Sequence, residues 1–274
     1  MNIDKNHITG SDNIKENVHK NTSIIIYIFL VIELVLYISF LYFDFSKNNS
    51  EISSIIKYIS IFICLLFVLF PVKKLNLAHT TIYDSRDIFI LRFALVFTFA
   101  SDYFLLFTNE IIAGLITFII VQLLYLIRIF NWKLDAGLIN RSKQPLYLYF
   151  FRNILIVIFV LIPIYILLSK PSQDTMLIVG LVAFYFISLL INLIDSIKIY
   201  SKTSSVRAKI FAIGLLFFVL CDINVGLFNI AYFIPINTFT YIKIYNISSI
   251  AMWLFYLPSQ VLISLSKNLL QSKV

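Results

Sequence analysis

Residues 87–107 read DIFILRFALVFTFASDYFLLF, and this stretch decides the fold class. Apolar side chains fill almost all of its 21 positions, and charge enters only at Asp87, Arg92 and Asp102. A helix needs about 20 mostly apolar residues to cross the hydrocarbon core of a bilayer. The stretch is long enough and apolar enough for that role, so it predicts a transmembrane helix.

Seven further apolar runs of similar length lie on either side of this stretch. They are Ser23–Phe43, Ser53–Phe70, Ile111–Phe130, Tyr149–Leu168, Thr175–Ile197, Val206–Tyr232 and Ile247–Ser266. Backbone groups find no water inside a bilayer, so spanning segments are helices or closed barrels, and the alternating pattern of barrel strands is absent. We therefore expect an all-α polytopic membrane bundle of about eight helices over residues 23–266. A flexible cytoplasmic tail is expected at 1–22 and a short one at 267–274.

The composition of the chain supports a membrane protein. Hydrophobic residues make up 60% of the sequence and charged residues 13%, and the mean hydropathy is +0.93. Soluble domains carry about 25% charged residues. The net charge of +8 comes without a basic stripe interleaved with exposed aromatics, so nucleic-acid binding is not expected. Cys64 and Cys221 lie inside apolar runs without metal-ligand spacing, which indicates small buried side chains.

The basic residues predict the orientation of the chain. With the N-terminus inside the cell, all but four of the 22 Lys and Arg residues fall on or within snorkelling reach of the cytoplasmic side. Arg92, Arg128 and Arg152 are counted as lying within snorkelling reach of that side. The four exceptions are Lys47, Lys57, Lys170 and Lys243. The positive-inside rule therefore predicts a multi-pass protein of the cell membrane with both termini in the cytoplasm.

Four carboxylates lie within the predicted spans, where an ionisable group is costly and asks for an explanation. Asp195 stands three residues before Lys198 near a helix end, which favours a solvated pair along one helix. Glu33 lies in the middle of the first span. It is either a structural hydrogen-bond partner or the lining of a cavity.

Asp102 and Asp222 have similar surroundings in the sequence. The first follows Phe-Thr-Phe-Ala-Ser at residues 97–101, and the second follows Phe-Phe-Val-Leu-Cys at residues 217–221. Both predicted helices run outward, so the two acids can meet at one depth. Two carboxyls that share a low-dielectric site do not both ionise easily, which suits one proton donor and one water-activating base. The alternative is that each ties helices together by hydrogen bonds.

Other polar side chains are candidates for lining the same interior. They are Gln122, Tyr125, Asn192, Asn224, Tyr256 and Gln260. Gln122 and Tyr125 share a helix face, as do Tyr256 and Gln260. No Ser-His-Asp triad is expected, because the three histidines, at positions 7, 19 and 79, lie in the tail or a loop. No phosphate-binding glycine loop, metal motif or cofactor motif is present in the sequence.

Three short motifs resemble the YhhN family of lysoplasmalogenase-like membrane proteins. Residues 99–125 resemble its Gly-Asp, Gly-Leu-x-x-Phe and His-x-x-Tyr pattern, with Asp102, Gly114, Phe118 and Tyr125 at matching places. Residues 216–222 are similar to its Phe-x-x-Ser-Asp segment, and residues 253–260 to its aromatic-Tyr-x-x-Ala-Gln ending. Four positions depart from the pattern. Ser101 replaces Gly, Gln122 replaces His, Cys221 replaces Ser and Ser259 replaces Ala.

The resemblance implies hydrolysis of the vinyl ether bond of lysoplasmalogens or related lysolipids, without a metal or other cofactor. It implies that Asp102 and Asp222 are the catalytic acid and base. Gln122, Tyr125, Asn224, Tyr256 and Gln260 would then orient water or the polar end of the lysophospholipid. A non-catalytic lipid-binding protein or a proton-coupled transporter on the same fold is the alternative, and a structural scaffold is a third. The sequence gives no oligomeric state.

Overall fold

A computed structural model of the chain describes residues 6–46, 50–70, 82–108, 110–167, 173–232 and 236–267. These residues form eight α-helices and no strand. The helices are α1 Asn6–Ser46, α2 Ser50–Leu69, α3 Ile82–Tyr103, α4 Ile111–Asp135, α5 Leu146–Leu167, α6 Gln173–Thr203, α7 Val206–Phe228 and α8 Thr238–Leu265. Seven are long and apolar enough to cross a membrane, and residues Leu146–Ile162 of α5 form a shorter apolar segment. The expected all-α polytopic membrane bundle is confirmed.

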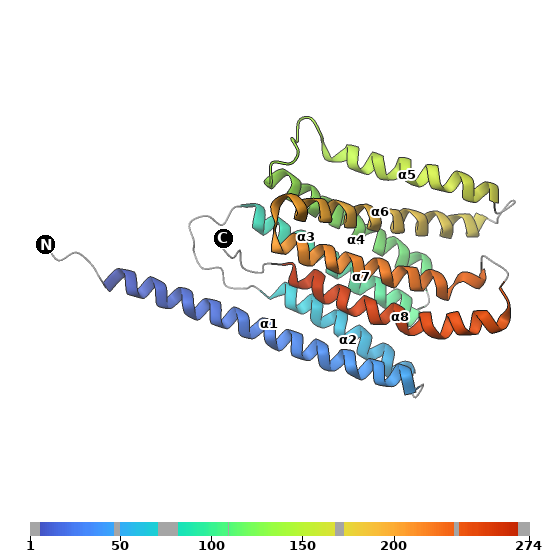
Figure 1. Cartoon of the computed structure of the whole chain (residues 1–274), viewed down its shortest axis with the longest axis horizontal. Helices are drawn as coiled ribbons and strands as arrows, with labels where there is room; N and C mark the ends of the chain where they lie inside the picture. Colours follow the sequence, from blue (N-terminus) through green and yellow to red (C-terminus); the bar gives the residue numbers. More distant parts are fainter. Residues whose placement is uncertain are drawn as a thin grey trace.

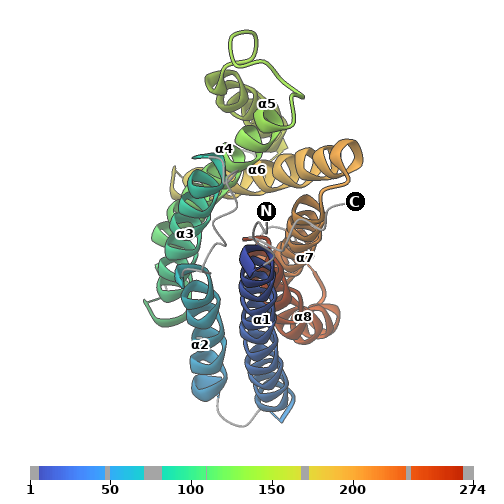
Figure 2. The same cartoon turned by 90° about the vertical axis from the view of Figure 1, so that its left-hand side faces the viewer.

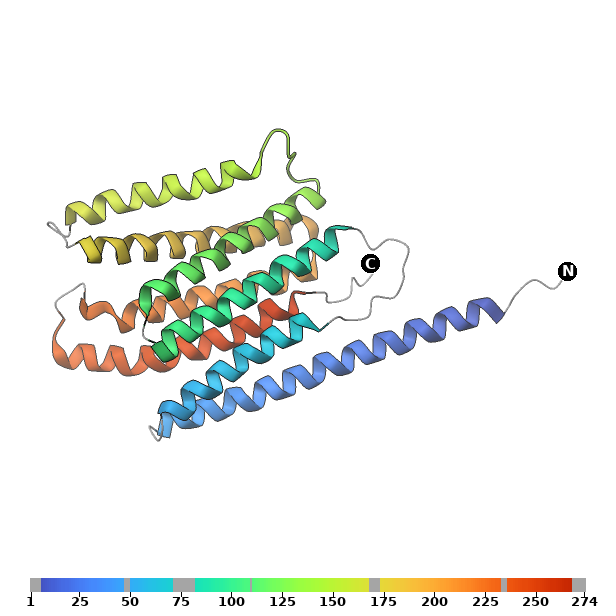
Figure 3. The same ribbon diagram turned by 180° about the vertical axis from the view of Figure 1, so that it is seen from behind.

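The first helix is longer than the apolar run that predicted it. It begins at Asn6, so most of the segment expected as a flexible tail continues the helix. Once a helix is nucleated, each further residue adds one backbone hydrogen bond, so an apolar span can extend into polar sequence. Figures 1 and 3 show this part of α1 extending past the other helices. Residues 1–5 and 268–274 lie outside the described residues, as do Lys47, Lys170 and His79.

Seven of the described helices form a ring, and α5 lies outside it. In the order α1, α2, α3, α4, α6, α7, α8, each helix packs against the next, and α8 packs back on α1 and α2. The view along the helices in Figure 2 shows this ring, with α5 beyond α6. The start of α1 and the end of α8 lie at the same end of the bundle (Figure 1), as eight helices of alternating direction require. The cytoplasmic placement of that end remains a prediction.

The outer surface of the bundle is apolar. Large side chains such as Tyr27, Phe159 and Ile247 are 70%, 78% and 69% exposed. An apolar surface on this scale is unstable in water, and it fits contact with lipid tails. The core lies between the helices of the ring, where Leu95, Phe211 and many other apolar side chains are fully buried. A bilayer therefore provides the natural solvent for this surface.

A proline inside α8 ties that helix to α1. Pro258 has no backbone N–H, so the carbonyl of Leu254, four residues earlier, loses its usual partner within the helix. The hydroxyl of Tyr37 on α1 donates to that carbonyl at 3.1 Å. The carbonyl that has no partner within α8 is thus hydrogen-bonded by a side chain of α1.

A buried arginine cluster joins α3, α4 and the end of α8 at the end of the bundle where α8 ends, here called the basic end. The guanidinium of Arg128 donates to both oxygens of Asp87 at 2.8 and 3.1 Å and to the hydroxyl and carbonyl of Ser266 at 2.8 and 3.0 Å. Trp132 also donates to Asp87, at 2.8 Å. Arg128 was expected within snorkelling reach of one membrane surface, and its side chain instead stays fully buried inside the bundle. Asp87 supplies the counter-charge that makes this burial possible.

The expected pairing of Asp195 with Lys198 was also wrong. Asp195 is buried, and its partner is Lys133 on α4, with 2.8 Å between Nζ and Oδ2. The side chain points across the interface between α6 and α4 instead of along its own helix. Spacing along one helix does not reveal a partner from a neighbouring helix.

Glu33 is a structural hydrogen-bond partner between α1 and α2. Its carboxyl accepts from the hydroxyl of Ser60 at 2.5 Å and from the thiol of Cys64 at 3.5 Å. Both cysteines are free and buried, as expected. Of the two readings of Glu33, the structure supports the hydrogen-bond tie.

Candidate functional site

Asp102 is placed by a change of helix type. It lies one residue before the end of α3, which continues as a π-helical turn over Phe104–Thr108. Such turns occur often at functional sites. The hydroxyl of Ser101 donates to the carbonyl of Gly114 at 2.6 Å and joins α3 to α4. A Cβ at Gly114 would lie 2.6 Å from a side-chain carbon of Leu105, so only glycine lets the turn pack this closely. The turn thereby fixes the direction of the Asp102 side chain.

Tyr256 on α8 is the partner of Asp102. Its hydroxyl lies 2.9 and 2.7 Å from the two carboxyl oxygens and donates to them. Both side chains are buried, with exposed fractions of 3% and 4%. The contact joins two helices that lie 154 residues apart in the sequence at this point.

Asp222 on α7 has a tyrosine of its own. Tyr185 on α6 lies beside it, close enough for the two side chains to interact electrostatically. The Oδ2 atom of Asp222 is buried and has no hydrogen-bond partner in the described part of the chain. A buried polar atom without a partner costs free energy unless water or a ligand meets it. Asp222 therefore has an oxygen free to act on a bound molecule.

The two acids belong to one cluster. Both lie within electrostatic range of Tyr185 and of the Cys221 thiol. The rings of Tyr185 and Tyr256 pack edge-on against Phe218, with centroids 6.3 and 5.5 Å away. Phe118 on α4 closes the group, 5.6 Å from Tyr185 and 6.4 Å from Tyr256. Five helices thus enclose two carboxyls in an aromatic, water-poor surrounding.

The other residues expected in the interior divide into two groups. Gln122, Tyr125 and Gln260 are fully buried. The Nε2 of Gln122, the hydroxyl of Tyr125 and both amide atoms of Gln260 have no hydrogen-bond partner among the described residues. Asn192 donates to the side-chain oxygen of Gln122 at 3.1 Å and to its carbonyl at 2.9 Å. Asn224 instead donates to the carbonyl of Leu220 on its own helix, at 2.8 Å, and is only partly buried.

Tyr185 was not among the site residues predicted from the sequence. The signal that could have found it is a polar stripe on α6, in which Tyr185, Ser188, Asn192 and Ser196 recur at helical spacing. All four side chains are buried. Among the many tyrosines of a membrane protein, only this periodicity separates Tyr185 from residues of the lipid interface.

The arrangement suits proton transfer. No group of three or more His, Cys, Asp or Glu side chains that could hold a metal occurs within the described residues. Two carboxyls with tyrosine neighbours, buried in an aromatic cluster, are groups that donate and accept protons at close range. The unpartnered amides of Gln122 and Gln260 and the hydroxyl of Tyr125 lie in the interior of the same bundle and can hold water or a polar end of a ligand.

The fold and this cluster define a polytopic helical membrane protein with paired acids in its interior. The YhhN family model matches residues 52–267, from the start of α2 to the end of α8. The chain therefore belongs to the YhhN family. No curated protein and no solved structure matches the chain, so the assignment rests on the family model. Helix α1, with Glu33, lies before the matched segment.

Proposed function

We propose that the chain is a membrane-embedded hydrolase that cleaves the vinyl ether bond of lysoplasmalogens or a related lysolipid. The observation that carries the proposal is the placement of two carboxyls in one aromatic cluster, where Asp102 and the Oδ2 atom of Asp222 are buried and each acid has a tyrosine beside it. Membership of the YhhN family supports the same reaction class. The apolar interior of the bundle and its lipid-facing surface fit a substrate with one long alkenyl chain.

The reaction needs one protonated and one ionised carboxyl. The protonated carboxyl gives its proton to the alkenyl carbon that is not bonded to oxygen, which leaves an oxocarbenium ion at the other alkenyl carbon. The ionised carboxyl takes a proton from water, and the water oxygen bonds to that cation to form a hemiacetal. The two carboxyls then exchange roles. One protonates the leaving ether oxygen, the other takes the hydroxyl proton, and the C–O bond breaks to give an aldehyde and a glycerophospho-alcohol.

The cycle restores both carboxyls to their starting protonation, so no external acid, base or oxidant is consumed. Tyr256 holds Asp102 in place by its hydrogen bond, and Tyr185 is the polar side chain beside Asp222. Gln260, with both amide atoms unpartnered, is placed one helical turn after Tyr256 and serves to hold water or the phosphoglycerol end.

The test is release of fatty aldehyde by the purified protein. Lysoplasmalogens with choline and ethanolamine head groups are the substrates, and a lysolipid with a saturated alkyl ether is the control. We expect aldehyde from the vinyl ethers and none from the saturated ether, because only a double bond can be protonated at carbon. Absence of aldehyde from well-folded protein in lipid, with every head group tried, contradicts the proposal.

A lipid-binding protein or transporter on the same fold is the second candidate. It is favoured by Gln122, which stands where the family pattern has His. An amide does not transfer protons, and Asn192 already occupies the Gln122 oxygen. This candidate predicts tight binding of a lysoplasmalogen without breakdown, and retention of that binding after Asp102→Asn.

A further inference from the structure

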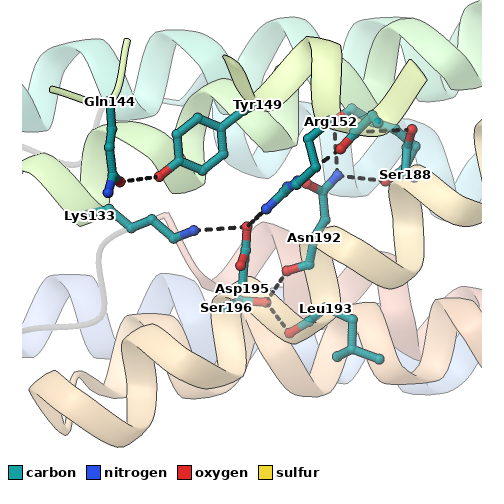
Figure 4. A network of polar contacts seen from close by, with 11 residues as sticks. Lys133, Gln144, Tyr149, Arg152, Ser188, Asn192, Leu193, Asp195 and Ser196 are labelled. Carbon is teal, nitrogen blue, oxygen red and sulfur yellow. Dashed lines mark hydrogen bonds and ion pairs between the residues drawn. The ribbon is translucent and has the colours of Figure 1, made fainter. Parts of the chain in front are cut away.

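The basic end contains a second charged group, in which two cations share one carboxylate. Lys133 Nζ lies 2.8 Å from Oδ2 of Asp195, and Arg152 Nη2 lies 3.4 Å from the same oxygen. Figure 4 shows both side chains converging on Asp195. Lys198 is also close enough to act on Lys133 electrostatically. One carboxylate cannot neutralise two cations, so this place keeps a net positive charge.

Part of this charge is shielded from solvent. The side chains of Lys133 and Asp195 are only 11% and 9% exposed, whereas that of Arg152 is 37% exposed. An uncompensated charge in such a place is costly, and a bound anion removes most of that cost. This is an electrostatic reason to expect a ligand of negative charge between α4, α5 and α6.

The guanidinium of Arg152 is free to take that ligand. Its contacts to Asp195 and to the side-chain oxygen of Asn153 are long, between 3.4 and 3.5 Å, and its Nε is buried without a partner among the described residues. Arg128, in the neighbouring cluster, makes four contacts between 2.8 and 3.1 Å. The planar fork of Arg152 therefore keeps donors that a phosphate can accept from.

The surroundings restrict where the anion can sit. The ring of Tyr149 lies 4.9 Å from Lys133 Nζ and 5.1 Å from the centre of the Arg152 guanidinium. The hydroxyl of Tyr149 donates to Gln144 at 3.2 Å, which holds the ring in place (Figure 4). Asn153, fully buried, donates to Ser188 at 3.5 Å. The side chains that surround the two cations come from α5, α6 and the segment before α5.

We propose that Lys133, Arg152 and Tyr149 form a binding site for the phosphate group of an anionic phospholipid. The site lies beside the end of α4 and the start of α5, at the depth where head groups lie. Helix α5 packs outside the ring, and its side chains Phe159 and Ile158 are 78% and 50% exposed. Acyl chains lying along this apolar surface place a phosphate next to Arg152. The proposal is independent of the hydrolase activity.

The test compares the full-length protein in nanodiscs of phosphatidylcholine with discs that also contain phosphatidylglycerol. We expect phosphatidylglycerol to raise the thermal unfolding midpoint and to stay bound in native mass spectra. Arg152→Gln should weaken that retention by about fivefold to tenfold, the contribution of one well-placed charge. Arg152→Gln keeps the Lys133–Asp195 pair, so the helix ends stay joined.

Three controls make the result decisive. Arg141→Gln removes the same charge from an exposed position at the same end and should leave retention unchanged. Arg152→Lys should recover part of the retention. Equal losses in Arg141→Gln and Arg152→Gln, or no effect of phosphatidylglycerol on the wild type, would overturn the site in favour of diffuse surface charge. An equal rise of the midpoint with inorganic phosphate in phosphatidylcholine discs would overturn the lipid as its source.

Discussion

The arginine cluster and the acid cluster are both buried and polar, but they differ in how their atoms are satisfied. The guanidinium of Arg128 donates to Asp87 and Ser266, and the indole N–H of Trp132 also donates to Asp87. Around Asp222 and Gln260, buried oxygen and nitrogen atoms have no partner in the described residues. Complete pairing stabilises a fold, whereas unpaired polar groups lower stability unless they meet a ligand. The comparison separates a structural centre from a candidate site.

The largest expected effect is on stability, in the arginine cluster. Arg128→Leu leaves Asp87 buried without its main counter-charge, which should lower the free energy of unfolding by about 3–5 kcal/mol. Thermal unfolding in detergent measures it. Arg128→Lys keeps the positive charge but loses the planar guanidinium that pairs with both oxygens of Asp87, so it should lower the free energy of unfolding by clearly less. Similar stability of Arg128→Leu and wild type would remove the distinction between the two clusters.

Gln260 gives the opposite test. Both of its amide atoms are buried and unpartnered, so Gln260→Met should leave the unfolding midpoint unchanged or raise it. The same change should lower aldehyde release by about 10- to 100-fold, because a positioned polar contact is lost. Asn224→Leu is the matched control. Its amide bonds only its own helix, so turnover should stay near the wild-type rate. A marked loss of stability in Gln260→Met would place Gln260 with the structural residues.

Tyr185 tests whether the acids act with their neighbours. Tyr185→Phe removes the hydroxyl beside Asp222 and keeps the ring contacts with Phe118 and Phe218. We expect turnover to fall by about tenfold, because Asp222 loses a polar neighbour that stabilises its charge. Tyr200→Phe, on the same helix, is the control and should leave the rate unchanged. Equal rates in wild type and Tyr185→Phe would leave Tyr185 as packing only.

The smallest effect is expected at Glu33. Glu33→Gln keeps an acceptor for Ser60, so the free energy of unfolding should change by about 1 kcal/mol or less. Turnover should be unchanged, because Glu33 lies on α1, outside the segment that matches the family. Aldehyde assays and thermal unfolding on the same preparation check both expectations. A large loss of turnover would extend the site to α1.

Much of the fold was predictable because the signal for a membrane helix lies within one continuous stretch of sequence. An apolar run of about 20 residues has one stable outcome in a bilayer, so the eight helices followed from the sequence. The errors concern contacts between helices. The pairing of Arg128 with Asp87 spans 41 residues and that of Lys133 with Asp195 spans 62, distances at which no local pattern operates. The same limit hid Tyr185 as the neighbour of Asp222.

Part of the candidate site was predictable from the sequence, because its polar residues stand out locally, whereas their contacts with other helices do not. Asp102, Asp222 and Gln260 stand out because polar groups are costly inside a span. Tyr256 was identified by its spacing from Gln260, and the structure joins it to Asp102. The π-helical turn after Asp102 has no clear signal in the sequence, since it depends on the close packing of Leu105 against Gly114.

The most direct measurement compares aldehyde release from a lysoplasmalogen by the wild type, Asp102→Asn and Asp222→Asn, each with an intact unfolding midpoint. Both variants should lose at least about 100-fold in rate, because each removes one partner of an acid–base pair. Loss in both folded variants is the result that the shared carboxyl cluster predicts. Turnover within about twofold of the wild type in either folded variant would contradict the central claim that the two acids act together.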